Sequence, residues 1–252
     1  MKHELSGPIQ SLFFFLKAAW KERETYMDET KVIEVKRDIL AGNDLAADRF
    51  RMRRKEEGTF LLDIMGSPGA GKTTFLLALM KCLAKDRKIR MGVIEADLES
   101  DVDALKIKAA GIPSVELNTK GVCHVEMGMM KKAFEAFGDQ KFDYLFLENI
   151  GNLVCPADFD TGCHSRIMLL SVPEGWDKVC KYPPMFAVVD ALIVTKCDYL
   201  PLNEDFDMDA LKEHARILNP DLDIFVTSAR TGEGMDEVAA WLSEKRKQLM
   251  AV

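Results

Sequence analysis

The stretch that decides the fold reads Met65-Gly66-Ser67-Pro68-Gly69-Ala70-Gly71-Lys72-Thr73-Thr74. It fits the pattern G-x-x-x-x-G-K-[ST], and it lies between an apolar run at 60–64 and an amphipathic run at 75–83. In such a loop the backbone N–H groups turn toward a phosphate, the lysine supplies positive charge to the terminal phosphates, and the threonine hydroxyl ligates Mg²⁺. We therefore predict that residues 66–74 bind a nucleotide, with Lys72 and Thr73 as catalytic groups.

Around this loop, apolar runs typical of strands alternate with segments of helical periodicity. The alternation predicts an α/β fold with a mostly parallel central sheet covered by helices on both faces. Together with the phosphate loop, this pattern resembles P-loop NTPases of the SIMIBI type. The expected strands are 59–65, 89–96, 114–118, 143–148, 167–172, 189–195 and 223–228, and the expected helices are 72–85, 100–110, 124–137, 208–218 and 235–250. The carboxyl ends of the strands should form the ligand edge.

The chain has 252 residues, 48% of them hydrophobic, which suffices for one substantial core. We expect a P-loop domain at 59–252 and an N-terminal helical extension at 1–58, in which 31–56 form one or two helices. The apolar stretch 11–20 is far shorter than the roughly 20 residues of a membrane span, so no span is expected. Residues 1–26 are either a surface or partner-binding helix, or an untranslated stretch before a start at Met27.

Charge and cysteine content narrow the class of protein. A net charge of −7 argues against nucleic-acid binding, which requires a basic face. The longest basic run, Arg51-Met52-Arg53-Arg54-Lys55, is expected to be a solvated helix face. Because a chain of this size needs no disulfide framework, its six cysteines indicate reduced thiols and a cytoplasmic protein.

Two carboxylates end predicted strands near the phosphate loop. Asp97 follows one strand, and Glu148 ends another in the sequence Glu148-Asn149-Ile150-Gly151. Mg²⁺ prefers such hard oxygen ligands beside the phosphates, so we predict Thr73, Asp97 and Glu148 as its ligands. The N–H of Gly151 is positioned to sense the γ-phosphate. An ordinary helix N-cap is the alternative role for Asp97.

The base is predicted from Thr195-Lys196-Cys197-Asp198, which resembles the N-K-x-D motif. The Asp198 carboxylate accepts the N1–H and N2–H₂ groups of guanine, whereas adenine presents an acceptor at N1. The Lys196 stem covers the base, and the loop Ser228-Ala229-Arg230 contacts guanine O6. These motifs follow the expected order, so the nucleotide is predicted to be GTP and the enzyme a GTPase.

Soft metal ligands occur on two loops of the same predicted sheet edge. Cys123 and His124 are adjacent, and Cys155 lies seven residues after Glu148. Two thiolates and an imidazole would offer Zn²⁺ or Ni²⁺ three ligands and leave one position open. From the residues alone, a capping histidine and two packed cysteines explain the pattern as well.

The chain is similar to the HypB family over about 31–250, through the segments 111–124, 147–160 and 181–186. Within them stand Asn118-Thr119-Lys120-Gly121-Val122-Cys123-His124 and Asn152-Leu153-Val154-Cys155-Pro156. The resemblance implies a GTPase that assists nickel insertion into [NiFe]-hydrogenase. It also implies metal binding by Cys123, His124 and Cys155, a GTP-dependent homodimer, and two partners: a nickel-delivery chaperone and the hydrogenase large subunit.

The chain also departs from that family. Its first 58 residues lack the Cys-rich or His-rich metal motif of some members, and the usual N-K-x-D is T-K-C-D. The additional pair Cys163-His164 either extends a metal site or is a loop pair without a ligand, and we favour the second. Two other functions stay open: maturation of another nickel enzyme, and a nucleotide-gated interaction protein with structural thiols.

Overall fold

The computed structural model of the chain describes residues 30–86, 88–96, 107–119 and 121–251, and of 30–39 it describes the backbone alone. Asp97 and the interpretations of residues 1–26 lie outside the described residues. The chain divides into two units after Gly42. The helix α2 (Thr30–Glu56) begins in the first unit, and the whole sheet belongs to the second, residues 43–252.

The second unit is built on a parallel sheet with the strand order β3-β2-β4-β1-β5-β6-β7. Every strand pairing recorded within it is parallel, which confirms the predicted sheet. The strands are β1 (Phe60–Gly66), β2 (Met91–Glu95), β3 (Ser114–Glu116), β4 (Tyr144–Glu148), β5 (Ser165–Ser171), β6 (Ala191–Thr195) and β7 (Asp223–Val226). The strand β1, which leads into the phosphate loop, therefore lies in the middle of the sheet.

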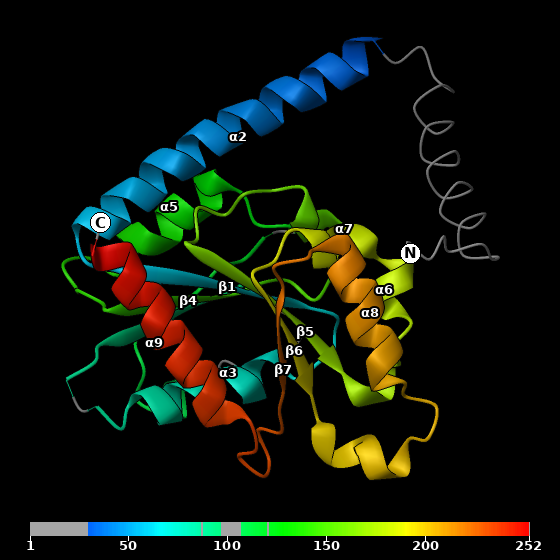
Figure 1. Cartoon of the computed structure of the whole chain (residues 1–252). Helices are drawn as coiled ribbons and strands as arrows, with labels where there is room; N and C mark the ends of the chain where they lie inside the picture. Colours follow the sequence, from blue (N-terminus) through cyan, green and yellow to red (C-terminus); the bar gives the residue numbers. More distant parts are fainter. Residues whose placement is uncertain (1–29, 87, 97–106, 120, 252) are drawn as a thin grey trace. The chain divides into compact units, whose positions relative to one another are not determined.

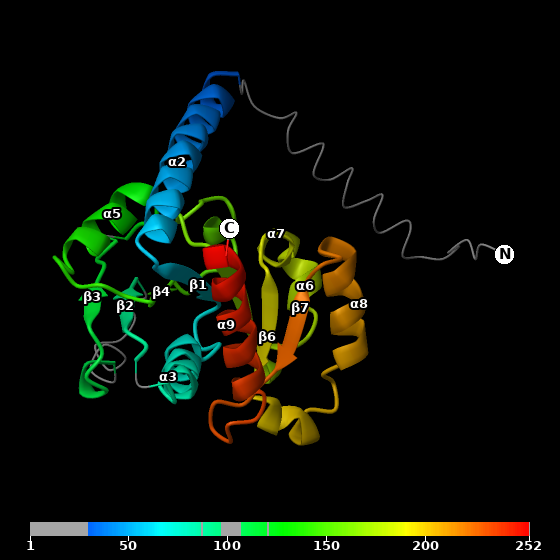
Figure 2. The ribbon, with the colours of Figure 1, turned by 60° about the vertical axis from the view of Figure 1, so that its left-hand side comes forward.

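Helices cover both faces of this sheet, as predicted (Figures 1 and 2). The helices α3 (Lys72–Leu83) and α9 (Met235–Ala251) pack against each other on one face. The opposite face carries the C-terminal half of α2 together with α5 (Met127–Glu135), α6 (Lys178–Lys181), α7 (Pro183–Ala187) and α8 (Met208–Leu218). Short 3₁₀ helices in the described part of the chain are η1 (Cys155–Ala157), η2 (Val172–Glu174) and η3 (Cys197–Leu202).

The central strand shows why the apolar runs are almost continuous. All seven residues of β1 are buried, because the sheet is covered on both faces. Leu62 and Ile64 pack toward α3 and α9, whereas Leu61 and Met65 belong to the two apolar clusters of the opposite face. Asp63 lies between Leu61 and Met65 on that second face and is fully buried. A carboxylate in this position requires hydrogen-bond donors around it.

The prediction that the basic run 51–55 is a solvated helix face is wrong at Arg54. This side chain is only 3% exposed, and its guanidinium lies 3.9 Å from the centroid of the Phe134 ring. Nη2 of Arg54 donates to Glu57 at 2.9 Å, while Nε and Nη1 are buried without a hydrogen-bond partner. Burial lowers the pKa of Arg54. The helix turns Arg54 onto the aromatic side of α5 while Arg53 stays exposed.

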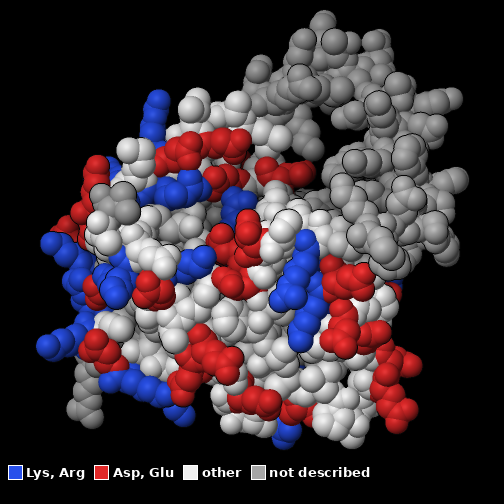
Figure 3. Space-filling model, in the orientation of Figure 1, with Lys and Arg blue, Asp and Glu red and all other residues white. Residues whose placement is uncertain are grey.

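Charged side chains are interspersed on the face drawn in Figure 3, with acidic groups gathered at the lower right. This mixture agrees with the net charge of −7. Among the helices that the structure describes, none has both the length and the apolar character needed to cross a membrane.

Candidate functional site

The phosphate loop connects β1 to α3 at the carboxyl edge of the sheet. Gly71 precedes α3 with φ 91°, a left-handed conformation that glycine adopts without strain and that turns the first N–H groups of the helix outward. Lys72 is buried, and its Nζ lies 3.2 Å from the carbonyl oxygen of Ser67 and 3.5 Å from that of Gly66. The lysine therefore lies within the loop where the terminal phosphates would bind.

The predicted Mg²⁺ ligands lie on adjacent elements. The Thr73 hydroxyl donates to Oε1 of Glu148 at 2.6 Å, which brings the start of α3 to the end of β4. Glu95, a second buried carboxylate, lies beside Glu148 in the strand register. A hydroxyl and carboxylates are the oxygen donors that Mg²⁺ prefers, so Thr73 and Glu148 fit this ion. Asp97, two residues beyond Glu95, stays a prediction because it is not among the described residues.

Gly151 approaches the phosphate loop closely. A Cβ atom at this position would lie 3.0 Å from the backbone nitrogen of Pro68. A side chain here would require the loop or the Glu148–Gly151 segment to give way by a few tenths of an ångström, so the glycine permits their close approach. The segment predicted to sense the γ-phosphate is in contact with the loop that would hold it.

Glu174 is a site residue that the sequence analysis missed. Its carboxylate accepts the hydroxyl of Ser67 and also the backbone N–H and hydroxyl of Ser171, at 2.9 and 2.7 Å. Glu174 thereby fixes the first turn of the phosphate loop to the end of β5. The local signal was the pattern Ser171-Val172-Pro173-Glu174, which is a capping box around η2.

The predicted base site is a cavity of about 210 Å³ between the phosphate loop, the start of η3 and the 228–230 loop. Asp198 accepts the hydroxyl of Ser228 at 2.6 Å and pairs with Nη2 of Arg230 at 2.8 Å. The Ser228 hydrogen bond is the main cause that lowers the pKa of Asp198. An ionised carboxylate at the wall of this cavity suits the N1–H and N2–H₂ donors of guanine.

The T-K-C-D segment is bonded directly to the phosphate loop. The Thr195 hydroxyl donates to the Ala70 carbonyl at 2.7 Å, and Nζ of Lys196 donates to the Gly69 carbonyl at 2.7 Å. Lys196 has φ 58°, so a left-handed backbone turn aims its stem back over the loop. Threonine in place of the usual asparagine thus has a defined role, because its hydroxyl joins the end of β6 to this loop.

The two predicted thiol ligands lie together. The Sγ atoms of Cys123 and Cys155 are 2.8 Å apart, and both cysteines are free thiols. Asn152 links their loops by donating to the Cys123 carbonyl at 3.2 Å. The ring of His124 stacks on Phe159 with 3.6 Å between centroids, and its Nδ1 lies 3.9 Å from Cys123 Sγ. The sequence analysis did not assign Asn152 and Phe159 to this site.

This group is two sulfurs with an imidazole held alongside. Within the described parts of the chain, no three His, Cys, Asp or Glu side chains are arranged to hold a metal ion. The neighbouring thiol of Cys155, followed by burial, raises the pKa of Cys123. Burial lowers the pKa of His124, which favours the neutral imidazole that a metal requires. A soft cation would bind both sulfurs as thiolates.

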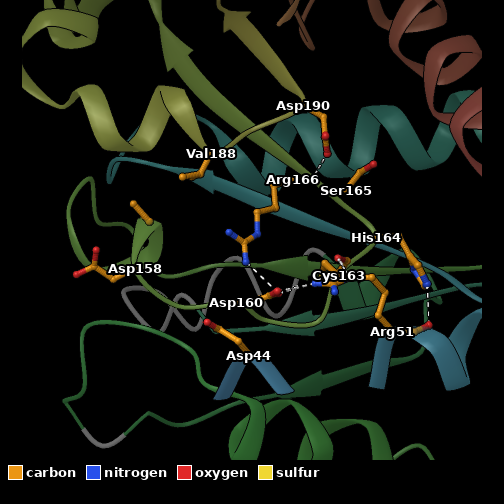
Figure 4. A pocket seen from close by; sticks show the side chains of 11 residues that line it. Asp44, Arg51, Asp158, Asp160, Cys163, His164, Ser165, Arg166, Val188 and Asp190 are labelled. Carbon is orange, nitrogen blue, oxygen red and sulfur yellow. Dashed lines mark hydrogen bonds and ion pairs between the residues drawn. The ribbon is translucent and has the colours of Figure 1, made fainter. Parts of the chain in front are cut away.

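Cys163 and His164 are placed as a structural pair. Cys163 is buried, and burial raises its pKa. Nδ1 of His164 accepts the Leu61 N–H at 2.9 Å, and Nε2 lies 3.0 Å from the Arg51 carbonyl, so both ring nitrogens have partners within the protein. Figure 4 shows His164 pointing toward Arg51 at the wall of a cavity of about 400 Å³. Both ring nitrogens of His164 are therefore used within the protein, and whether the pair binds a ligand stays a prediction.

Comparisons with known proteins agree with the fold. The sequence profile described as CobW/HypB/UreG, nucleotide-binding domain, matches residues 61–226. Hydrogenase maturation factor HypB of Azotobacter chroococcum is 41% identical over 220 residues, covering 87% of this chain and 71% of the relative. Hydrogenase/urease maturation factor HypB of Helicobacter hepaticus is 37% identical over 222 residues, covering 86% and 90%.

A solved structure is similar over most of its length. The crystal structure of HypB from Helicobacter pylori in complex with nickel superposes with a TM-score of 0.75 at 36% identity, and the match covers 82% of this chain and 96% of that one. The profile match covers the phosphate loop, Glu148, the two thiol loops and the strand β6 that leads to the predicted base site. The chain therefore belongs to the CobW/HypB/UreG family of nucleotide-binding proteins.

Proposed function

We propose that this protein is a GTP-hydrolysing metallochaperone that delivers nickel to a metalloenzyme, with [NiFe]-hydrogenase as its client. The observation that carries the proposal is the short segment from Glu148 to Cys155. One end is hydrogen-bonded to Thr73 at the nucleotide site, and the other presents a thiol next to Cys123. The group that contacts the nucleotide site, Glu148, and the proposed metal ligand, Cys155, are therefore only seven residues apart in the chain.

The chain supplies most groups needed for phosphoryl transfer by position and charge. Lys72 and the N-terminal N–H groups of α3 would bind the β- and γ-phosphates, and Asp198 would select guanine. Thr73 and Glu148, with Asp97, would hold Mg²⁺, which neutralises developing charge on the phosphates when bound. Gly151 is in contact with Pro68, so the presence or loss of the γ-phosphate would change the position of Gly151 and of the segment that follows it.

Nickel enters this scheme as cargo. Cys123 and Cys155 would bind it as thiolates, and His124 would add an imidazole nitrogen after a small movement away from Phe159. Three protein ligands leave a coordination position for an acceptor, which suits transfer better than storage. Zn²⁺ uses the same ligand types and is the competing ion.

We further propose that the protein works in the cytoplasm as a GTP-dependent homodimer. The nickel-delivery chaperone and the hydrogenase large subunit are its proposed partners. Val122 and Val154 are exposed and each directly precedes one of the two thiols in the chain, so apolar side chains stand next to the proposed metal ligands. A partner that binds there would meet the metal directly.

The deciding experiment is a titration with Ni²⁺ and Zn²⁺ of the full chain loaded with GDP or with GTPγS, with molecular mass followed by light scattering. We expect one metal ion per chain, an affinity that differs between the two nucleotides, and a dimer in GTPγS. Cys123→Ser with Cys155→Ser should abolish binding and leave nucleotide affinity unchanged. Cys180→Ser, which removes another exposed thiol, is the matched control. A metal affinity that is the same in the GDP and GTPγS forms would exclude coupling between the nucleotide and the metal site.

Hydrolysis is tested separately. Lys72→Ala removes the charge that faces the terminal phosphates, and we expect turnover of GTP to become undetectable while the fold is retained. Lys196→Ala is informative beside it, because this lysine contacts the loop from the base side and should alter KM more than kcat. Normal hydrolysis by Lys72→Ala would refute the catalytic assignment.

The client is tested by maturation in vitro. The Helicobacter relative is named for both hydrogenase and urease, so apo forms of both enzymes should be offered the nickel-loaded protein. Activation of hydrogenase alone supports the proposed client. Activation of urease would reassign it, and failure to bind metal at all would leave a nucleotide-gated interaction protein with structural thiols.

A further inference from the structure

The segment 149–164 connects β4 to β5, and β1 lies between these two strands in the sheet. This segment, called the crossover below, must therefore pass over one face of β1. Its first residue, Asn149, donates its N–H to the Ile64 carbonyl at 3.0 Å, and its last, His164, donates to the Leu61 carbonyl at 2.9 Å. Cys155, the proposed nickel ligand, lies near the middle of the crossover.

One buried carboxylate of β1 faces the crossover near both of its ends. Nδ2 of Asn149 lies 3.0 and 3.2 Å from the two carboxylate oxygens of Asp63, and the hydroxyl of Thr161 donates to Oδ2 at 2.9 Å. All three side chains are buried. The residues that Asp63 binds are 86 and 98 positions away in sequence. Asp63 thus joins the strand that precedes the phosphate loop to both ends of the crossover.

The side chains that contact Asp63 are hydrogen-bond donors, so they suit a carboxylate that accepts. Asn149 uses its amide nitrogen for Asp63 and its carbonyl oxygen for the Ile150 N–H at 2.8 Å, so its orientation is fixed. Burial raises the pKa of Asp63, while the cation of Arg166 and the Asn149 and Thr161 hydrogen bonds act in the opposite direction. Removing these donors would leave a buried carboxylate without partners, which is costly.

Apart from Asp63, the two ends of the crossover have different contacts with the rest of the protein. Asp160, beside Thr161, accepts Nη2 of Arg51 at 2.7 and 2.6 Å and pairs with Arg166 at 3.0 Å. Figure 4 shows the two arginines converging on this carboxylate. Asn43 adds a hydrogen bond to the Asp160 carbonyl at 2.8 Å. The far end is therefore anchored to α2 and β5, whereas the near end, Asn149, directly follows Glu148 of the nucleotide site.

We propose that Asp63 is a positioning residue that sets the place of Cys155 and couples it to the nucleotide, an inference that rests on the proposed function. A shift of Glu148 on loss of the γ-phosphate moves Asn149 with it. Because Thr161 is held, the intervening residues must rearrange, and Cys155 separates from Cys123. The hydrogen bond from Asn149 to Asp63 determines whether the crossover holds Cys155 next to Cys123 or apart from it.

The test uses Asp63→Asn, which places two amides against each other, and the reciprocal variant Asp63→Asn with Asn149→Asp, which restores an amide–carboxylate pair in reverse. Thr161→Val, which keeps the side-chain shape, removes the second donor alone. For Asp63→Asn we expect the ratio of Ni²⁺ affinities between GTPγS and GDP forms to fall by about tenfold, the loss expected for one buried hydrogen bond to a charged group. GTPγS affinity should stay within about twofold.

A second readout does not depend on metal. The amides of residues 150–155, 157 and 158 should exchange hydrogen roughly tenfold faster in Asp63→Asn, with normal rates restored in the reciprocal variant. Unchanged exchange in folded Asp63→Asn would overturn the positioning role, and faster exchange with an unaltered affinity ratio would overturn the coupling. If the wild type binds no metal, the proposed function fails, while exchange still decides whether Asp63 holds the crossover. If Asp63→Asn does not fold, Thr161→Val and the reciprocal variant decide by the same two readouts.

Discussion

The sulfur atoms of Cys123 and Cys155 lie 2.8 Å apart, although the residues are 32 positions apart in the chain. Their closeness depends on two loops at the same sheet edge, which Asn152 joins through the Cys123 carbonyl. At this distance the thiol of Cys155 is the main cause that raises the pKa of Cys123.

The first prediction concerns the contact between these two thiols. Cys155→Ala should lower the pKa of Cys123 toward its ordinary value, because the Cys155 thiol is the main cause of its elevation. The pH midpoint for alkylation of Cys123 by iodoacetamide, followed by peptide mass, should therefore move down. Cys180→Ser should leave that midpoint in place, and an unchanged midpoint in Cys155→Ala would contradict the contact.

The second prediction concerns the base. Asp198→Asn replaces a carboxylate that accepts both guanine donors with an amide whose N–H₂ faces one of them. We expect kcat/KM for GTP to fall by roughly 10²-fold, and that for xanthosine triphosphate, which has a carbonyl at C2, to rise. Arg230→Met removes the ion pair with Asp198 but leaves the acceptor, so its preference for guanine should persist. An equal fall in kcat/KM for GTP and for xanthosine triphosphate would argue against base recognition by Asp198.

The third prediction is a pH dependence of stability. Burial lowers the pKa of His164 to about 4, against about 6.5 in an unfolded chain. Between these values the unfolded state binds a proton that the native state does not, so the unfolding free energy falls as pH decreases, by roughly 3 kcal/mol across the window. His164→Gln keeps a donor and an acceptor but does not titrate. Urea unfolding from pH 7 to pH 4 should show a smaller fall in this variant, and parallel curves would refute the assignment.

The fourth prediction concerns Arg54. Methionine has a similar length and no unpaired N–H groups, so Arg54→Met should leave the unfolding free energy unchanged or raise it by up to about 2 kcal/mol. Arg53→Met, on the exposed side of the same helix turn, should change it by less than about 0.5 kcal/mol. Denaturant unfolding of the two variants gives the comparison. A loss well above 1 kcal/mol at position 54 would show that contact of the guanidinium with Phe134 outweighs its unpaired donors.

Much of the fold was predictable because its signals are local. Strand ends and helix faces follow from apolar runs and periodicity, and helix 208–218 has the predicted bounds. The motifs that contain Lys72 and Asp198 are each recognised by the fixed spacing of their own residues. Both follow predicted strands, so a parallel sheet places them at the same edge.

The remaining site residues depend on long-range partners. Asp63 stands in an apolar run, and nothing near it in sequence indicates that Asn149 and Thr161 donate to it. The buried position of Arg54 depends on Phe134, far along the chain. Whether Cys163 and His164 bind metal depends on backbone groups of other elements, and these use both ring nitrogens.

The bonds from Thr195 and Lys196 to the phosphate loop have a consequence for nucleotide exchange. The carbonyls of Ala70 and Gly69 accept them, so the loop predicted to hold the phosphates and the strand end predicted to recognise the base are joined directly. A displacement of one would strain these two hydrogen bonds and so act on the other. We therefore expect the two ends of the nucleotide site to open together.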